Sequence, residues 1–172
     1  MGLVTMNKNL VLNKEQISQK IRRMAHQIYE ENYESDTIVL VGIEGQGYYL
    51  AKMLQKILIQ ISQQKIELCK LSINKTKPMQ FPISLDKDES TLQNQPIILI
   101  DDVLYTGKTM AYGLLPLLKA EPKSIQTAVV VHRSYKNYPI QANFVGHALA
   151  TTLNEYIEVV LEDEQKMGVY IA

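Results

Sequence analysis

The sequence is that of a 172-residue chain in which 46% of the residues are hydrophobic and 21% are charged, with 18 basic side chains matching 18 acidic ones. This length and composition predict one folded domain over residues 1–172 and argue against a disordered or fibrous chain. The formal net charge of zero gives no support for nonspecific nucleic-acid binding, which usually requires a basic surplus.

Cysteine content and apolar segments bear on the subcellular location of the protein. The single cysteine, Cys69, excludes an internal disulfide framework, and its apolar neighbours predict a buried side chain. Residues 1–16 lack the apolar region of a signal peptide, and no apolar stretch reaches the roughly 18 residues of a membrane span. These features predict a cytoplasmic protein.

The first half of the chain is predicted to alternate helix and strand. Asn13 and Gln16 form a capping-box pair ahead of apolar side chains that recur on one helical face. A continuous β-branched run then predicts a strand buried on both faces, and this run stops at a Glu-Gly-Gln-Gly sequence. The predicted elements are, in order, a helix over 12–32, a strand over 36–43, a helix over 48–64 and a strand over 65–73.

The second half opens with a polar, proline-containing excursion over residues 74–95. Such a segment predicts a mobile hairpin or loop, and long excursions in small domains are often functional. After it we predict a strand over 96–103, a helix over 107–119 that Pro116 kinks or breaks, a strand over 124–132 and a β-hairpin over 156–172. Alternating strands and helices predict an α/β fold with a doubly wound, mainly parallel sheet and flanking helices.

The stretch 97–110, IILIDDVLYTGKTM, carries the strongest functional signal. Gly107, Lys108 and Thr109 fit the end of a P-loop, whose first glycine would then stand at position 102. Asp102 stands there instead, and a carboxylate would repel a triphosphate and block the close backbone approach that glycine permits. The stretch is therefore not a P-loop.

The two ends of this stretch suit two parts of one ligand. The backbone N–H groups of Thr106 to Thr109 open a helix, where amides and the helix dipole favour a compact phosphate. Asp101 and Asp102 end the strand, and carboxylates accept hydrogen bonds from the vicinal hydroxyls of a ribose. A ribose 5-phosphate satisfies both ends. The alternative is an acidic strand end that merely precedes an ordinary helix cap.

The same stretch resembles the phosphoribosyl-diphosphate signature of the type I phosphoribosyltransferases. The resemblance implies their fold, with a small hood beside the sheet and the C-terminal hairpin. It also implies that the two aspartates contact the ribose hydroxyls and that the following loop binds the 5-phosphate. The residues it assigns to phosphoribosyl diphosphate are Asp101, Asp102, Val103, Leu104, Tyr105, Thr106, Gly107, Lys108 and Thr109.

A second segment, LVGIEGQGYYLAKML, is similar to the pyrophosphate loop of the pyrimidine operon attenuation regulators that are also uracil phosphoribosyltransferases. Where these relatives have Lys-Thr-Arg, this chain has Glu44, Gly45 and Gln46. It therefore lacks two positive charges and has a carboxylate that repels a diphosphate. Lys75 replaces their arginine in the following excursion and keeps the charge without the bidentate fork. In the fold of this family the strands over 37–43 and 96–103 are neighbours, so the loop after the first strand and the loop over 102–109 would flank one crevice. The loop residues are Glu44, Gly45, Gln46 and Gly47.

The likeness continues through residues 128–152, which are similar to the base-side segment of these regulators, and implies that His132 and Arg133 lie on the base side. His132 is either a local hydrogen-bonding group or a general base. Purine-specific relatives have an aspartate two residues before the loop glycine, where this chain has Tyr105, and this difference favours a pyrimidine. Basic side chains at 22–26 on the first helix form either a solvated face or an RNA contact.

Two functions remain open. The first is transfer of a phosphoribosyl group from phosphoribosyl diphosphate to uracil, giving UMP and diphosphate, with Mg²⁺ bridging pyrophosphate and ribose oxygens. Asp101 and Asp102 would then reach the metal only through the ligand. The second is a regulator that senses a nucleotide with little turnover and acts on RNA or on a protein partner. Transfer to a base other than uracil also remains possible, because the signature residues are assigned to the ribose phosphate and not to the base. The resemblance implies a homodimer or a larger assembly.

Overall fold

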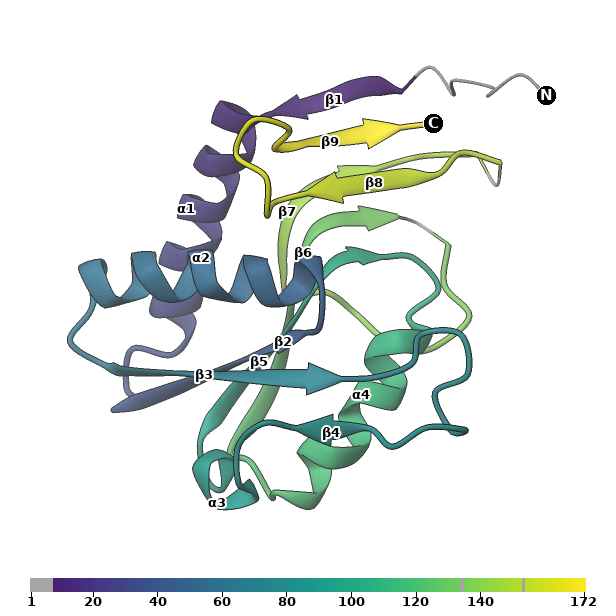
Figure 1. Cartoon of the computed structure of the whole chain (residues 1–172). Helices are drawn as coiled ribbons and strands as arrows, with labels where there is room; N and C mark the ends of the chain where they lie inside the picture. The colour runs from purple at the N-terminus through teal and green to yellow at the C-terminus, as the bar shows by residue number, and fades with distance from the viewer. Residues whose placement is uncertain (1–7, 134, 153) are drawn as a thin grey trace.

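A six-stranded sheet forms the centre of the computed structural model, which describes residues 8–133, 135–152 and 154–172 (Figure 1). The strand order is β4-β3-β2-β5-β6-β7, and every neighbouring pair is parallel except β3 with β4. The predicted α/β fold with a mainly parallel sheet is confirmed. The strands are β2 (Thr37–Ile43), β3 (Lys65–Ser72), β4 (Ser84–Leu85), β5 (Pro96–Leu104), β6 (Ser124–Arg133) and β7 (Phe144–Leu149).

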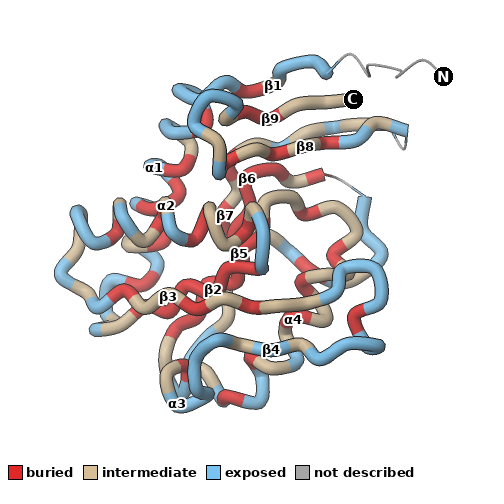
Figure 2. Tube along the Cα trace, in the orientation of Figure 1, coloured by how far each residue is buried: buried red, intermediate tan, exposed pale blue. Residues whose placement is uncertain are grey.

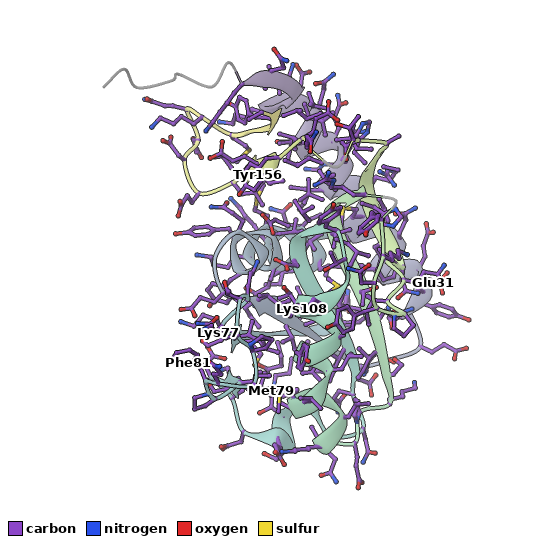
Figure 3. The ribbon with its side chains drawn as sticks, turned by 90° about the vertical axis from the view of Figure 1, so that its right-hand side faces the viewer. Glu31, Lys77, Met79, Phe81, Lys108 and Tyr156 are labelled. Carbon is purple, nitrogen blue, oxygen red and sulfur yellow. The ribbon has the colours of Figure 1, made fainter. Side chains whose placement is uncertain are left out.

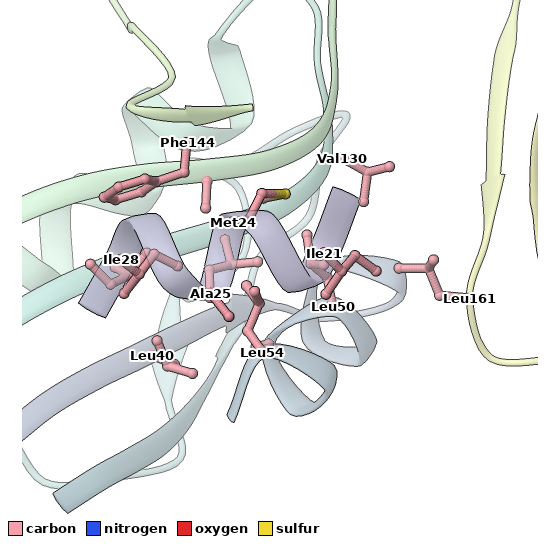
Figure 4. Close-up of a cluster of buried hydrophobic side chains, with 14 of the residues drawn as sticks. Ile21, Met24, Ala25, Ile28, Leu40, Leu50, Leu54, Val130, Phe144 and Leu161 are labelled. Carbon is pink, nitrogen blue, oxygen red and sulfur yellow. The ribbon is translucent and has the colours of Figure 1, made fainter. Parts of the chain in front are cut away.

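Helices cover both faces of this sheet, which explains the continuous apolar runs of its central strands. Alternate residues of β2 face opposite sides: Leu40 packs in the cluster that contains α1 and α2, and Val41 packs in the cluster that contains α4. Figure 4 shows the first cluster, to which α1 contributes Met24 and Ala25 and α2 contributes Leu50 and Leu54. The helices are α1 (Lys14–Glu31), α2 (Gln46–Ile61), α3 (Glu89–Leu92) and α4 (Lys108–Lys119).

A local signal in the sequence matches the start of α1. The Asn13 side chain accepts from the Gln16 backbone, and the Gln16 side chain accepts from the Asn13 backbone, as the predicted capping box requires. Cys69 is fully buried, as expected.

A kink or a break was expected at Pro116, and the break is wrong, because α4 continues through this residue. Burial of Gly113 and Leu117 against the sheet holds the helix together across the missing proline N–H.

A second, three-stranded sheet lies apart from the first, at the top of Figure 1, in the order β1-β9-β8. Its strands are β1 (Asn9–Asn13), β8 (Ile157–Val160) and β9 (Gly168–Ile171). The predicted C-terminal hairpin is confirmed by the antiparallel pairing of β8 with β9. Two strands were not predicted: β1, which completes this sheet along β9, and β7 at the edge of the main sheet.

The excursion over residues 74–95 folds back on the sheet as a hairpin, since β4 pairs antiparallel with β3. Its charged segment 86–90 is exposed, and Figure 2 shows pale blue along this outer part of the chain against the red central strands. No helix within the described ranges has the length and apolar character needed to cross a bilayer.

Candidate functional site

The strand order reverses between β2 and β5, which lie side by side and parallel. From β2 the chain passes through α2 to β3 on one side, and from β5 it passes through α4 to β6 on the other. Loops that follow the carboxyl ends of such a strand pair diverge and leave a crevice where ligands bind. The loops that follow β2 and β5 therefore lie at the same edge of the sheet, as expected.

A cavity of about 500 Å³ opens at this edge of the sheet. Its wall combines the end of β5, the start of α4, one residue of the 74–95 excursion, the end of β6 and the turn before β8. The residues that line it are Lys75, Asp101, Asp102, Val103, Leu104, Tyr105, Thr106, Gly107, Lys108, Thr109, Met110, Arg133, Asn154, Glu155, Tyr156 and Ile157. All nine residues from Asp101 to Thr109 are thus brought to one cavity.

The loop after β5 is built to present the start of α4. Gly107 is the N-cap of this helix and has a φ of +84°, a left-handed conformation that favours glycine. The carbonyl of Thr106 accepts from the backbone N of Asn137 at 2.9 Å and of Tyr138 at 3.0 Å, which fixes the loop against the segment after β6. The first backbone N–H groups of α4 therefore meet the cavity in a fixed arrangement suited to an anion.

The two carboxylates differ in their surroundings. Asp101 is only 2% exposed, and its Oδ1 accepts from the backbone N of Asp102 at 2.9 Å and lies 3.2 Å from Lys75 Nζ. Asp102 is partly exposed, and its Oδ1 lies 4.0 Å from the same ammonium group. Burial and the neighbouring Asp102 carboxylate outweigh the Lys75 ammonium and raise the pKa of Asp101 to about 8. Burial disfavours charge on Lys75, but the two carboxylates prevail and raise its pKa.

The loop over 44–47 lies beside this acidic pair. A side-chain carbon at Gly47 would lie 2.8 Å from the Ile100 carbonyl oxygen and 2.9 Å from Asp101 Cα, so α2 starts directly against β5. Glu44 is exposed, and Gln46 is occupied elsewhere, since its Oε1 accepts from the backbone N of Leu161 at 2.8 Å. The loop is near the cavity, but none of its four residues is among those that line it.

The structure separates the two residues expected on the base side. Arg133 lines the cavity, whereas His132 lines a different cavity of about 440 Å³ with Lys136 and the segment 139–142. Consecutive residues of a strand point to opposite faces, which explains the separation. Burial, followed by the charge of Lys136, lowers the pKa of His132.

The turn that precedes β8 supplies cavity residues that the sequence analysis did not single out: Asn154, Glu155, Tyr156 and Ile157. Tyr156 is 67% exposed, and in Figure 3 it lies toward the small sheet, above Lys108 at the start of α4. Its backbone exchanges two hydrogen bonds with Ala172, so the turn is anchored in the small sheet. The pattern carries no signal for this role beyond the start of the predicted hairpin.

Comparison with known proteins identifies the family. The model of the phosphoribosyl transferase domain matches residues 9–164. The chain belongs to the phosphoribosyl transferase domain family. This match confirms the resemblance of residues 97–109 to type I phosphoribosyltransferases and extends it over most of the chain.

Curated relatives of this phosphoribosyltransferase-family chain match it over nearly its full length. The Bifunctional protein PyrR of Staphylococcus aureus strain bovine RF122 / ET3-1 is 34% identical over 177 aligned positions, covering 96% of this chain and 99% of the relative. The Bifunctional protein PyrR of Macrococcus caseolyticus is 31% identical, with the same coverage of both chains.

Solved structures support the fold at lower identity. A hypoxanthine phosphoribosyltransferase of Trypanosoma cruzi has a TM-score of 0.77 at 14% identity and covers 95% of each chain. A hypoxanthine phosphoribosyltransferase of Staphylococcus aureus has a TM-score of 0.74 at 20% identity and covers 100% of this chain and 96% of its own. These neighbours bear on the fold and leave the acceptor base open.

Proposed function

We propose that the protein transfers a phosphoribosyl group from phosphoribosyl diphosphate to uracil, forming UMP and diphosphate. The observation that carries this proposal is the joint placement, in one cavity, of the Asp101–Asp102 pair and the N-terminus of α4 behind Gly107. Carboxylates that accept from a diol and backbone amides that hold a phosphate suit the two ends of a ribose 5-phosphate.

In the proposed reaction, the bond between ribose C1 and the diphosphate oxygen breaks while a ring nitrogen of the base bonds to C1 and loses its proton. The chain contributes by positioning: the acidic pair orients the ribose, and the loop that follows it holds the 5-phosphate. Lys108 and Lys75 supply positive charge within the cavity lining.

The acidic pair also fits a role for Mg²⁺ through the ligand. No group of three or more His, Cys, Asp or Glu side chains within the described ranges is arranged to hold a metal. Two carboxylates without a third protein ligand suit Mg²⁺, which retains several coordinated waters and is bound largely by substrate oxygens. When bound, the ion would neutralise the leaving diphosphate, with Asp101 and Asp102 holding the ribose hydroxyls beside it.

Uracil is favoured as the acceptor by two observations of different kinds. The curated relatives share about a third of their residues with this chain over nearly their full length and carry the name Bifunctional protein PyrR. In addition, Tyr105 lies in the cavity lining at the position where the purine-specific relatives have an aspartate. The base side is assigned to Arg133, and not to His132, because only Arg133 meets the cavity.

A second candidate is a nucleotide sensor with little turnover, acting on RNA or a protein partner. The loop over 44–47 favours it: this loop carries no cation, Glu44 is exposed, and the Gln46 side chain bonds to Leu161. Weak neutralisation of the diphosphate would slow its departure more than it would weaken binding of a monophosphate.

The test is an assay of nucleotide formation by the purified protein with Mg²⁺ and phosphoribosyl diphosphate. Uracil, cytosine, hypoxanthine, guanine and adenine are compared as acceptors. We expect UMP as the main product. Product with hypoxanthine or guanine alone would refute the choice of uracil, and no product with any base, together with measurable ligand binding, would favour the sensor.

A further inference from the structure

Arg133 is the last residue of β6 and has an unusual environment for an arginine. It is only 6% exposed, and no carboxylate of the described residues forms an ion pair with it. Buried arginines normally pair with an acid, since an uncompensated buried charge is costly. The contacts that replace a carboxylate here therefore indicate what the side chain does.

Neutral acceptors before β8 bind two of the three guanidinium nitrogens. Arg133 Nε donates to Thr151 Oγ1 at 2.7 Å, and its Nη2 donates to the carbonyl oxygens of Thr152 and Glu155, each at 3.1 Å. Two of these residues also bond to each other, because the backbone N of Thr152 donates to Glu155 Oε2 at 2.6 Å. Three hydrogen bonds from two nitrogens of one planar group thus hold the chain where it passes from β7 toward β8.

The same guanidinium packs on the ribose-phosphate side of the cavity. Its central carbon lies 4.0 Å from the centroid of the Tyr105 ring, and the Tyr135 ring centroid lies 5.5 Å from that of Tyr105. A planar cation on an aromatic face is an attractive arrangement that a lysine cannot reproduce together with a fork of hydrogen bonds. Arg133 therefore joins the loop after β5 to the turn that contains Thr151, Thr152 and Glu155.

This junction sets one wall of the cavity. Residues 154–157 line the cavity beside Tyr105, and the turn that carries them is held by Arg133. Thr151 and Thr152 themselves are not among the lining residues. Displacement of the turn would move the wall relative to a ribose phosphate held at Asp101 to Thr109 while leaving that part of the site in place.

We propose that Arg133 is a positioning residue for the base: through Thr151, Thr152 and Glu155 it holds the segment before β8 against Tyr105, and so sets where residues 154–157 meet the base of a bound nucleotide. This inference rests on the proposed function only in assuming that the cavity holds a phosphoribosyl group with a base attached. It differs from a direct contact of the Arg133 charge with the base, because the effect passes through Thr151 and the turn.

The test compares Thr151→Val with Thr152→Val in nucleotide binding by titration calorimetry. Thr151→Val removes the acceptor of Arg133 Nε with little change of shape. Thr152→Val makes the same change one residue away, on an exposed side chain whose hydroxyl forms no hydrogen bond with the described residues, and keeps the carbonyl that Arg133 uses. Arg133→Lys keeps the charge and loses the fork. Thermal unfolding checks that all variants are folded.

The readout is the ratio of the dissociation constants of ribose 5-phosphate and the nucleoside monophosphate that the wild type binds best, chosen from UMP, CMP, IMP, GMP and AMP. We expect Thr151→Val and Arg133→Lys to lower this ratio about tenfold, with ribose 5-phosphate affinity within about twofold of wild type, because small misplacements of a binding wall have effects of this order or larger. Thr152→Val should keep the wild-type ratio.

A wild-type ratio in Thr151→Val, together with a lost ratio in Arg133→Lys, would mean that the arginine contacts the base directly, and the proposal would be overturned. A wild type that binds no nucleotide more tightly than ribose 5-phosphate would overturn it as well, since the wall would then contact no base. If a nucleotide other than UMP binds best, the choice of uracil fails while the test of Arg133 proceeds with that nucleotide.

Discussion

The close approach of α2 to β5 at Gly47 predicts an opposite response of two helical glycines to the same substitution. In Gly47→Ala, the added carbon would lie 2.8 Å from the Ile100 carbonyl oxygen, 2.9 Å from Asp101 Cα and 3.0 Å from Asp101 Oδ1. In Gly113→Ala, the nearest atoms are side-chain carbons of Leu71 and Leu99 at 3.7 and 3.8 Å, which is ordinary contact.

The expected magnitudes follow from these distances. Alanine is more favourable than glycine in a helix interior by about 1 kcal/mol, and Gly113→Ala should gain roughly this amount. At Gly47 two of the three atoms belong to the backbone and cannot rotate away, so the overpacking term should reach about 3 kcal/mol, at the upper end of its usual range. The net change for Gly47→Ala is then a loss of ~2 kcal/mol, and the two variants should differ by ~3 kcal/mol.

Urea unfolding followed by circular dichroism measures both free energies of unfolding in one experiment. Gly47→Ala should also weaken binding of ribose 5-phosphate, because the displaced atoms belong to Asp101. Free energies of unfolding that agree within about 0.5 kcal/mol between the two variants, the usual range for unconstrained substitutions, would refute the close packing of α2 on β5.

Three further predictions concern the loop, the acidic pair and the first helix. Gly107→Ala places a side chain in a left-handed conformation and 3.2 Å from Ile140 Cβ, so it should lower the free energy of unfolding by about 1–2 kcal/mol in urea melts and weaken phosphate binding. The pKa of Asp101 rises from 3.8 to about 8 on folding, so the folded state binds this proton more tightly than the unfolded state. The resulting stabilisation is present at low pH and is lost as the pH rises from 3.8 to about 8. The free energy of unfolding should therefore fall over that range in the wild type and fall less in Asp101→Asn. Asn13→Ala removes half of the capping box and should lower the free energy of unfolding by about 1 kcal/mol, whereas Asn9→Ala, in the exposed start of β1, should change it little.

The sequence predicts those features that depend on neighbours along the chain. The apolar runs of β2 and β5, the Asn13–Gln16 box and the aspartate pair before Gly107 are each written within one short stretch, and the structure has the predicted elements there. The adjacency of β2 and β5, which the resemblance to type I phosphoribosyltransferases implied, is also present in the structure.

What the sequence does not predict depends on side chains that meet from distant segments. Arg133 contacts Tyr105 and Thr151, and no periodic pattern links these three positions. Strand alternation separates His132 from Arg133, but which of the two meets the ligand cavity depends on the segments that pack on each face of β6. β1 was missed because its pattern is short and its partner, β9, lies at the other end of the chain.

Binding of phosphoribosyl diphosphate to the wild type and to the Asp101→Asn, Asp102→Asn double variant, measured by titration calorimetry with Mg²⁺ present, tests the central claim most directly. Asp88→Asn is the matched control, since Asp88 is exposed and lies outside the cavity lining. We predict binding by the wild type and the control, and loss of binding by the double variant. Equal affinity of the double variant and the wild type would contradict the assignment of this cavity as the phosphoribosyl site.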